Sequence, residues 1–312
     1  MTDAISADDV AIRVEAVQLG PAGDVRGAVG VVEDAAGRAA AWQGRRVLVG
    51  MFDACGECDV CRRGGAPVCP RGRRRELGAG DRHTRAAARW LVALDDGLVV
   101  DGPAAAAVPG DVAFAYTLYA RTGVAPRDPV VITGGDAVAR FLVEILLAKG
   151  VAPVMVVDPA AEGAEAWSAW LGARGAGLAR ISAAASDADA RAAATEAIAA
   201  IAQDPTAAKT GGRPWRVIAT DDLPRAAALA GPRATLTARA GAVADGGAAL
   251  VAALAREVAI LGVAGPHPDL VLEAAALVAK GELDLAAGVL VRRADDAPSP
   301  DVTRAHIVVP PD

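Results

Sequence analysis

Four cysteines are the residues in this sequence whose type and spacing point most directly to chemistry. They follow the pattern C-x2-C-x2-C-x7-C, at Cys55, Cys58, Cys61 and Cys69, and the sequence contains no other cysteine. Zinc prefers thiolate ligands, and gaps of two residues let successive thiolates reach one ion. Two disulfides or four unrelated thiols are the alternatives, but so tight a cluster without a secretory signal favours a metal. Because four protein ligands close a tetrahedral shell, the sequence predicts a structural zinc and not a catalytic one.

The length and composition narrow the class of protein. A chain of 312 residues is long enough for two domains, each with its own core. Hydrophobic residues make up 53% of it and aromatic residues only 3%, so we expect cores built from alanine and valine. No apolar run is as long as a transmembrane helix requires, and no leader precedes the first strand. With a net charge of −6, we expect a cytoplasmic protein without membrane or nucleic-acid partners.

One basic run, residues 71–75, follows the cysteines directly. A solvated loop face is the simpler interpretation of such a run. A binding site for phosphate or CoA-like anions is the alternative, because clustered guanidinium groups bind phosphate oxygens in pairs.

Short strands separated by glycine-rich turns fill the first hundred or so residues. Residues 9–19 place the apolar side chains of Ile12 and Val14 between polar neighbours, as a half-buried strand does. Residues 27–33 and 46–49 are predicted to form two further strands, and the second leads into the cysteine cluster. This pattern is typical of a small β-barrel.

The pattern changes near residue 113. A short apolar strand at residues 130–132 is followed by Thr133-Gly134-Gly135-Asp136, and residues 137–149 then carry apolar side chains on one helical face. A second buried strand, residues 154–157, ends at Asp158. Strand, glycine turn, helix, strand and acidic residue, in that order, predict a dinucleotide-binding βαβ unit. Further helices are expected at 114–121, 161–172, 187–203 and 269–280, and further strands at 215–219, 234–237, 258–263 and 307–309.

The cysteine cluster followed by this βαβ unit resembles the zinc-containing medium-chain dehydrogenases, the alcohol dehydrogenase family. Weaker likenesses occur in the family's order at residues 9–20, 30–37, 44–47 and 280–285. The resemblance implies an NAD(P)-dependent oxidoreductase of the α/β class. It also implies two domains. Residues 1–112 plus 265–312 would form a GroES-like β-barrel with the structural zinc lobe, and residues 113–264 a Rossmann doubly wound parallel sheet.

The family's chemistry uses a second zinc with an open position, which acts as a Lewis acid on the alcohol or carbonyl oxygen. When this sequence is aligned with the family's motifs, the family's cysteine ligand falls at Gly20, its histidine ligand at Arg26 and its third ligand at Asp111. Glycine has no ligand atom, and a guanidinium group has no lone pair to donate. The resemblance therefore implies that catalytic zinc is lost, and that these three positions are vestigial.

The cofactor fingerprint G-x-G-x-x-G/A is also altered. Gly134 and Gly135 are followed by Asp136 at the position where the backbone approaches the pyrophosphate, although Ala139 is an accepted third residue. A carboxylate there adds bulk and like charge beside a dianion. Asp158 stands where a ribose-binding acid belongs, or else simply ends the strand, and it would repel the 2′-phosphate of NADP. These five residues are the candidate cofactor contacts, and they predict weakened binding of NAD.

The histidines supply no replacement ligands. His83 lies in a polar segment, His267 stands between two prolines, and His306 falls in the last expected strand. Each is expected to be a surface or turn residue.

Two hypotheses about function follow. Metal ligands and the phosphate glycine are lost together while the zinc lobe is complete, which favours a degenerate member with an assembly or regulatory role. Its partner is expected to be a second copy or a related dehydrogenase, joined through the apolar edge strand at residues 257–263. The alternative is a zinc-independent NAD(P)-dependent oxidoreductase acting on a small carbonyl, alcohol or acyl-CoA substrate, polarised by Tyr116, Tyr119 or Arg26.

Overall fold

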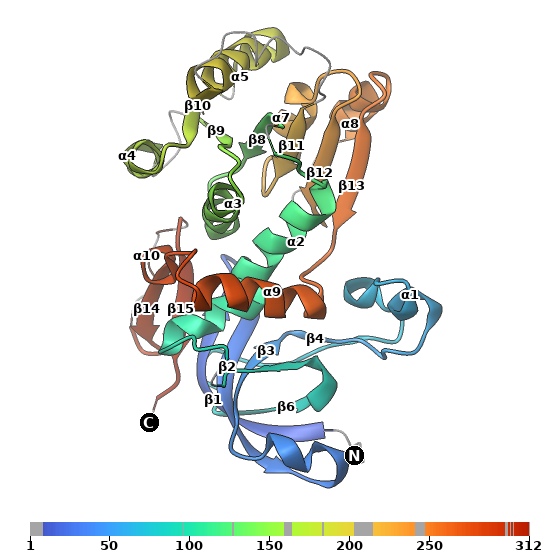
Figure 1. The fold of residues 1–312 in the computed structure, drawn as a ribbon, viewed down its shortest axis with the longest axis vertical. Helices are drawn as coiled ribbons and strands as arrows, with labels where there is room; N and C mark the ends of the chain where they lie inside the picture. Colours follow the sequence, from blue (N-terminus) through green and yellow to red (C-terminus); the bar gives the residue numbers. More distant parts are fainter. Residues whose placement is uncertain are drawn as a thin grey trace. The chain divides into compact units, whose positions relative to one another are not determined.

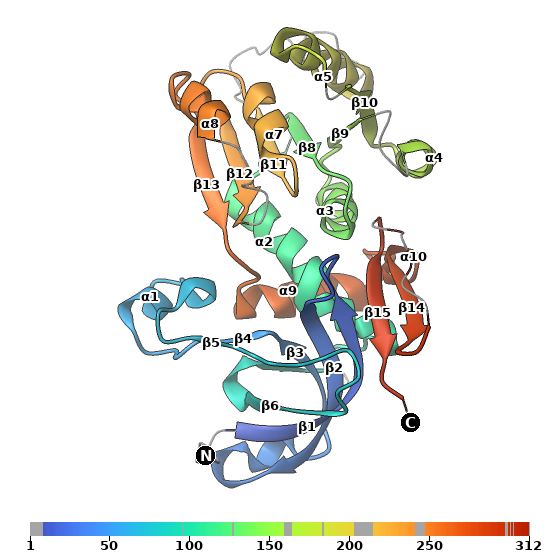
Figure 2. The same ribbon diagram turned by 180° about the vertical axis from the view of Figure 1, so that it is seen from behind.

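The computed structural model describes residues 9–95, 97–126, 128–158, 164–182, 184–202, 215–240, 247–296, 299, 301 and 303–311. The chain divides into two compact units, Met1–Tyr116 with Gly265–Asp312, and Thr117–Ala264. Figure 1 shows both units and Figure 2 shows them from behind. Among the described residues, no helix combines the length and the apolar character needed to cross a membrane.

The first unit is built on a seven-stranded sheet in the order β14-β15-β1-β2-β3-β7, with β6 also paired to β1. Its strands are β1 (Asp9–Leu19), β2 (Val25–Ala35), β3 (Arg46–Gly50), β6 (His83–Ala87), β7 (Leu91–Ala93), β14 (Val289–Arg293) and β15 (Ala305–Val309). β1 is the central strand, because it pairs antiparallel with β2, β6 and β15. Its side chains alternate as the sequence predicts, with Val10, Ile12 and Val14 all buried.

Helical segments complete this unit. They are η1 (Gly37–Trp42), η3 (Ala88–Trp90), η4 (Pro103–Ala107), η5 (Val108–Val112), α9 (Pro268–Ala279) and α10 (Leu285–Gly288), while α2 (Ala113–Thr122) runs from the first unit into the second. η4 packs on β1 and β2 with Ala105, Ala106 and Ala107 fully buried. Small side chains let this segment lie close to the sheet, which is how an alanine-rich chain fills its core at normal density.

The second unit is a six-stranded parallel sheet in the order β10-β9-β8-β11-β12-β13. Its strands are β8 (Val130–Thr133), β9 (Val154–Val157), β10 (Gly177–Arg180), β11 (Arg216–Ala219), β12 (Thr235–Arg239) and β13 (Ala259–Val263). Its helices are α3 (Ala137–Ala148), α4 (Ala164–Arg174), α5 (Asp187–Ala202), α7 (Leu223–Leu229) and α8 (Gly247–Leu254).

Numbered within this unit, the strand order is 3-2-1-4-5-6, which is the doubly wound Rossmann order. All four residues of β8 are buried, as a parallel strand covered on both faces requires. On α3, Phe141, Leu142, Ile145 and Leu146 are fully buried, so the helical face read from the sequence packs into the core. The predicted α/β fold class, a GroES-like barrel with a Rossmann sheet, is confirmed.

Candidate functional site

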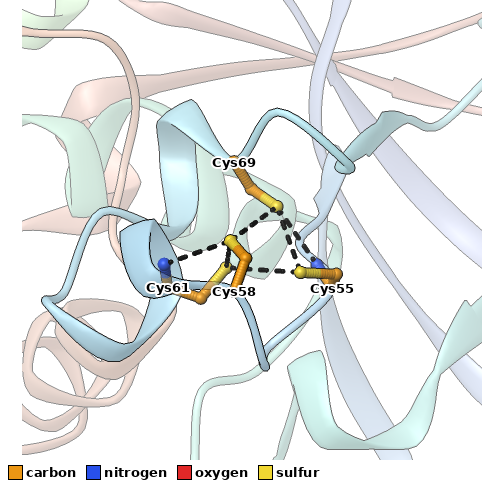
Figure 3. A group of neighbouring side chains, drawn as sticks. All are labelled: Cys55, Cys58, Cys61 and Cys69. Carbon is orange, nitrogen blue, oxygen red and sulfur yellow. Dashed lines mark hydrogen bonds between the residues drawn. The ribbon is translucent and has the colours of Figure 1, made fainter.

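The four cysteines converge in a lobe of the first unit. The lobe consists of β4 (Phe52–Asp53), α1 (Asp59–Arg62), η2 (Ala66–Val68) and β5 (Arg73–Arg74). Cys55, Cys58, Cys61 and Cys69 place their sulfur atoms within 4.8 Å of one another, and Figure 3 shows all four side chains pointing to a common centre. The recorded Sγ–Sγ distances are 3.5, 3.5, 3.8 and 3.9 Å. A tetrahedron with Zn–S bonds of about 2.3 Å has edges of about 3.8 Å, so the thiols fit zinc closely.

Hydrogen bonding in the lobe favours thiolates at specific cysteines. The backbone N–H of Cys61 donates to Cys58 Sγ, and that of Cys55 donates to Cys69 Sγ. The pKa of the Cys55 thiol is lowered to about 6, chiefly by the backbone N–H of Glu57. Burial and the neighbouring thiols instead raise the pKa of Cys61 to about 12. Four adjacent thiolates therefore need a cation at their centre, and Zn2+ supplies that charge when bound.

Polar contacts hold the lobe together and fasten it to the barrel. Arg75 pairs with Asp53 at 2.6 Å, and the Arg75 side chain is only 6% exposed. The indole N–H of Trp90 donates to the carbonyl of Ala54 at 2.8 Å. The basic run is therefore not wholly a solvated loop face. Its last member is buried in an ion pair, and Arg74 reaches Asp24 on the barrel at 3.2 Å.

The three positions that the resemblance assigns to the catalytic metal lie together in the first unit. Arg26 on β2 extends its guanidinium group toward Gly20, and Arg26 Nη1 donates to Asp111 Oδ1 at 2.9 Å. A Cβ atom at Gly20 would lie 2.4 Å from both Arg26 Nε and Asp24 Oδ1, so glycine leaves room for these two side chains as they stand. The side chains of Arg26 and Asp111 are 16% and 4% exposed, which makes this a largely buried ion pair. Two of the positions that the resemblance assigns to metal ligands therefore hold a guanidinium–carboxylate pair.

The backbone around Asp111 is adapted to this pair. Gln18 is fully buried on β1, and its side-chain oxygen accepts the backbone N–H of Asp111 at 3.0 Å. A Cβ atom at Gly110 would lie 1.9 Å from that oxygen, so glycine allows η5 to approach β1. No sequence motif identifies Gln18, because a glutamine within a strand has no characteristic spacing to other polar residues.

The cofactor loop lies at the carboxyl end of β8 in the second unit. Gly134 adopts φ = +120°, a conformation that favours glycine. Asp136 is the N-cap of α3, and its Oδ1 accepts the backbone N–H of Ala139 at 3.0 Å. Its other oxygen, Oδ2, pairs with Arg239 Nη1 at 2.7 Å. The negative charge that the sequence places at the pyrophosphate position is therefore that of a carboxylate held by two partners, Ala139 and Arg239.

Three residues that the sequence did not single out also contact this loop: Arg239, Asp221 and Trp167. Asp221 follows β11, and its Oδ2 accepts the backbone N–H of Gly135 at 3.2 Å. The indole N–H of Trp167 on α4 donates to the carbonyl of Gly135 at 3.3 Å. Asp221 is exposed as a residue, but its carboxylate faces the loop, where burial and then the charge of Asp136 raise its pKa to about 6. No sequence motif marks these residues, because they come from three separate elements.

The remaining candidates lie on other elements. Asp158 follows β9 directly and is partly buried. Tyr116 and Tyr119 are partly buried on α2, on either side of the boundary between the two units. The histidines are in three separate places: His83 is exposed beside Glu33, His267 caps α9, and His306 lies on β15 beside the carbonyl of Asp301.

The architecture and the zinc lobe define a class: the chain has the fold of the medium-chain dehydrogenases. Galactitol-1-phosphate dehydrogenase from Escherichia coli aligns over 99% of this chain and 95% of its own, with a TM-score of 0.75 and 14% identity. Alcohol dehydrogenase TADH from Thermus sp. ATN1 aligns over 99% and 94%, with a TM-score of 0.74 and 17% identity.

A short chain alcohol dehydrogenase (rspB) from E. coli CFT073, solved with its cofactor NADH, aligns over 98% of this chain and 93% of its own. Its TM-score is 0.75 at 14% identity. No protein-family model matches the sequence, and no curated protein matches it. The likeness is therefore one of fold.

Proposed function

We propose that this chain is a zinc-stabilised protein with the alcohol dehydrogenase fold that serves an assembly or regulatory role and does not carry out zinc-dependent hydride transfer. The observation that carries the proposal is the ion pair of Arg26 with Asp111, whose guanidinium group fills the space beside Gly20. A catalytic zinc accepts the substrate oxygen as a ligand and lowers its pKa. A guanidinium group can only donate hydrogen bonds, and it stays protonated at any working pH.

The zinc-independent oxidoreductase is the second candidate. Asp158 at the end of β9 favours it, because an acid at this place binds the ribose of NAD in Rossmann units. The likeness to an NADH-bound dehydrogenase points the same way. In that case Arg26 would polarise the substrate by hydrogen bonding, with Tyr116 or Tyr119 as further donors. Nucleotide binding separates this candidate from the first.

Metal analysis tests the loss of the catalytic site. The purified protein should contain close to one zinc per chain, held by the four cysteines. The double variant Gly20→Cys/Arg26→His should gain a second equivalent, because a thiolate, an imidazole and the carboxylate of Asp111 would then face one another. Cobalt absorption would report the new site.

Gly20→Cys alone is the control for that experiment. It should gain no metal, because the guanidinium group of Arg26 still occupies the space into which the new side chain points. Two zinc equivalents in the unmutated protein would contradict the proposal directly.

The proposed assembly uses the free edge of the parallel sheet. Among the strands that the structure describes, β13 pairs with β12 alone, and its residues Ala259 and Gly262 are exposed. The strand carries no charge or proline, the usual protections of an edge. If a second copy, or a related dehydrogenase, paired through β13, the edge strands of both molecules would be covered in one contact.

Ala259→Lys should break this assembly. A lysine on the edge strand leaves a charge in a buried contact, so sedimentation at micromolar concentration should show the dimer of the unmutated protein replaced by monomer. Val291→Lys is the matched control, since Val291 is exposed on β14, the edge strand of the other sheet. An unmutated protein that sediments as a stable monomer would refute the assembly role through this edge.

A further inference from the structure

In the second unit, β8 and β11 lie side by side at the switch point of the parallel sheet. In a sheet of order 3-2-1-4-5-6, the strand order reverses at these two strands, and ligands bind outside their carboxyl ends. The glycine loop Gly134–Gly135 leaves β8 there, and Thr220–Asp221 leaves β11 beside it. The contacts between these two loops determine whether a ligand can bind there.

The two loops are in direct contact. A Cβ atom at Gly134 would lie 2.1 Å from Thr220 Oγ1 and 2.6 Å from Asp221 Oδ1, so this face of the glycine lies against atoms of the other loop. Thr220 Oγ1 also donates to the carbonyl of Thr133 at 3.2 Å. The crevice at the switch point is therefore packed with the chain's own polar groups.

The peptide groups of the loop are also engaged. A dinucleotide's pyrophosphate is held by backbone N–H groups at the N-terminus of the helix that follows the glycines. Here the N–H of Gly135 donates to Asp221 at 3.2 Å, and that of Ala139 donates to Asp136 at 3.0 Å. The carbonyl of Gly135 accepts from Trp167, whose side chain is 3% exposed and so closes the loop from the side of α4.

An ion pair lies at the N-terminus of α3, beside the glycine loop. The carboxylate of Asp136 sits at the positive end of α3, where an anion is favoured, and Arg239 neutralises it at 2.7 Å. Both side chains are largely buried, at 13% and 15% exposure. An Asp–Arg pair at a helix N-terminus reproduces, inside the protein, the contact that a phosphate group would make with the helix and a cation.

We propose that the dinucleotide site of this unit is occupied by the chain itself. Asp136 stands in for a phosphate group, Arg239 is its counter-charge, and Asp221 and Trp167 hold the glycine loop closed. The inference goes beyond the proposed function, which rests on the ion pair of Arg26 with Asp111 in the other unit. It also implies a latent site: without the carboxylate, the N–H of Ala139 and the guanidinium group of Arg239 would no longer be held by Asp136 and could contact a phosphate.

Titration with NADH and with ADP-ribose, on the full zinc-loaded chain at pH 7.5, tests the proposal. The unmutated protein should show no saturation up to about 1 mM of either probe, on the scale of weak binding. Asp136→Gly should bind both probes at least about tenfold more tightly, because glycine removes the charge and is still tolerated as an N-cap. Asp136→Gly/Arg239→Gln should lose that gain.

Asp222→Asn is the matched control. Asp222 is likewise an N-cap at the end of a neighbouring strand, and it accepts the backbone N–H of Arg225 at 2.9 Å. This change should leave binding of both probes as weak as in the unmutated protein. If Asp136→Gly fails to fold, as judged by its circular dichroism and zinc content, Asp136→Asn keeps a side-chain cap and replaces it in the same titration.

Thermal stability at two pH values tests the same loop contacts without any ligand. The carboxylate of Asp221 faces Asp136, Asp222, Arg239 and the N–H of Gly135, and its raised pKa means that the folded protein disfavours its charged form. Its contribution to stability is present below its ordinary pKa of 3.8 and is lost as the pH rises through about 6. Asp221→Asn should therefore raise the Tm at pH 8 by about 2 °C and leave it unchanged at pH 4.

Two outcomes overturn the inference. One is a Kd for NADH below about 100 μM in the unmutated protein. The other is an Asp136→Gly variant that folds but binds no more tightly than its parent. Neither outcome bears on the zinc count, so a single zinc equivalent in the same sample would leave the proposed loss of catalytic metal standing while the nucleotide inference fails.

Discussion

Cys58→Ser should strip the chain of its zinc and lower its Tm by about 10 °C or more. The reason is that the lobe has little else to hold it together. Its buried residues are Ala54, Ala66 and Cys69, with Phe52 and Trp90 packed against them. A serine oxygen is a poor substitute for a thiolate on zinc, and three remaining thiols cannot close a tetrahedral shell. Because a structural site binds metal only when folded, the lost binding free energy is lost stability.

Val68→Ser is the control for this variant. Val68 lies in the same lobe, next to Cys69, and is 58% exposed, so its replacement should change neither the zinc content nor the Tm appreciably. The measurement is differential scanning fluorimetry with zinc analysis of the same samples. A Cys58→Ser protein that keeps its zinc and its Tm would show that the four cysteines are not its ligands.

Arg26→Ala should destabilise the protein by about 3 kcal/mol. The carboxylate of Asp111 is 4% exposed, and removing the guanidinium group deprives it of its neutralising charge at 2.9 Å. Chemical denaturation followed by circular dichroism would measure the loss. Arg26→Ala/Asp111→Asn should recover most of it, since a neutral amide is far less costly to bury than a carboxylate.

An exposed pair on the same sheet gives the comparison. Arg13 and Glu33 lie 3.0 Å apart with side chains 47% and 42% exposed, so Arg13→Ala should cost less than about 0.5 kcal/mol. Equal costs for Arg26→Ala and Arg13→Ala would mean that the buried pair does not organise the vestigial site. A large difference would support a structural role for the cation that replaces the metal.

The zinc lobe could be predicted from the sequence because its ligands are local. Four cysteines within residues 55–69 can only meet one another, whatever the rest of the chain does. Gly20, Arg26 and Asp111 could be placed through the family resemblance, and the structure brings them together. The βαβ unit at residues 130–158 was readable because its strands are continuous apolar runs and its helix has a clear apolar face.

The contacts that close the nucleotide loop could not be predicted in this way. Asp221, Arg239 and Trp167 are distant in sequence from Asp136, and only the parallel pairing of β8, β11 and β12 brings two of them to one edge. Several short elements were missed for a different reason. β10 has four residues and α7 seven, and alanine and glycine in such segments give too few apolar side chains to establish a period.

The pairing of β1 with β15 has a consequence for how the chain folds during its synthesis. Val17 lies opposite Val308, so the central strand of the first sheet acquires this neighbour only after all the residues between them have been made. The entire second unit, Thr117–Ala264, leaves the ribosome in between and can fold as a contiguous piece. β6 pairs with residues 9–13 of β1, but residues 17–19 offer their backbone to any nascent strand nearby until residues 305–309 arrive. Sheet closure of such high contact order is slow. We therefore expect the nascent first unit, rather than the Rossmann unit, to be the part of this protein that depends on chaperones.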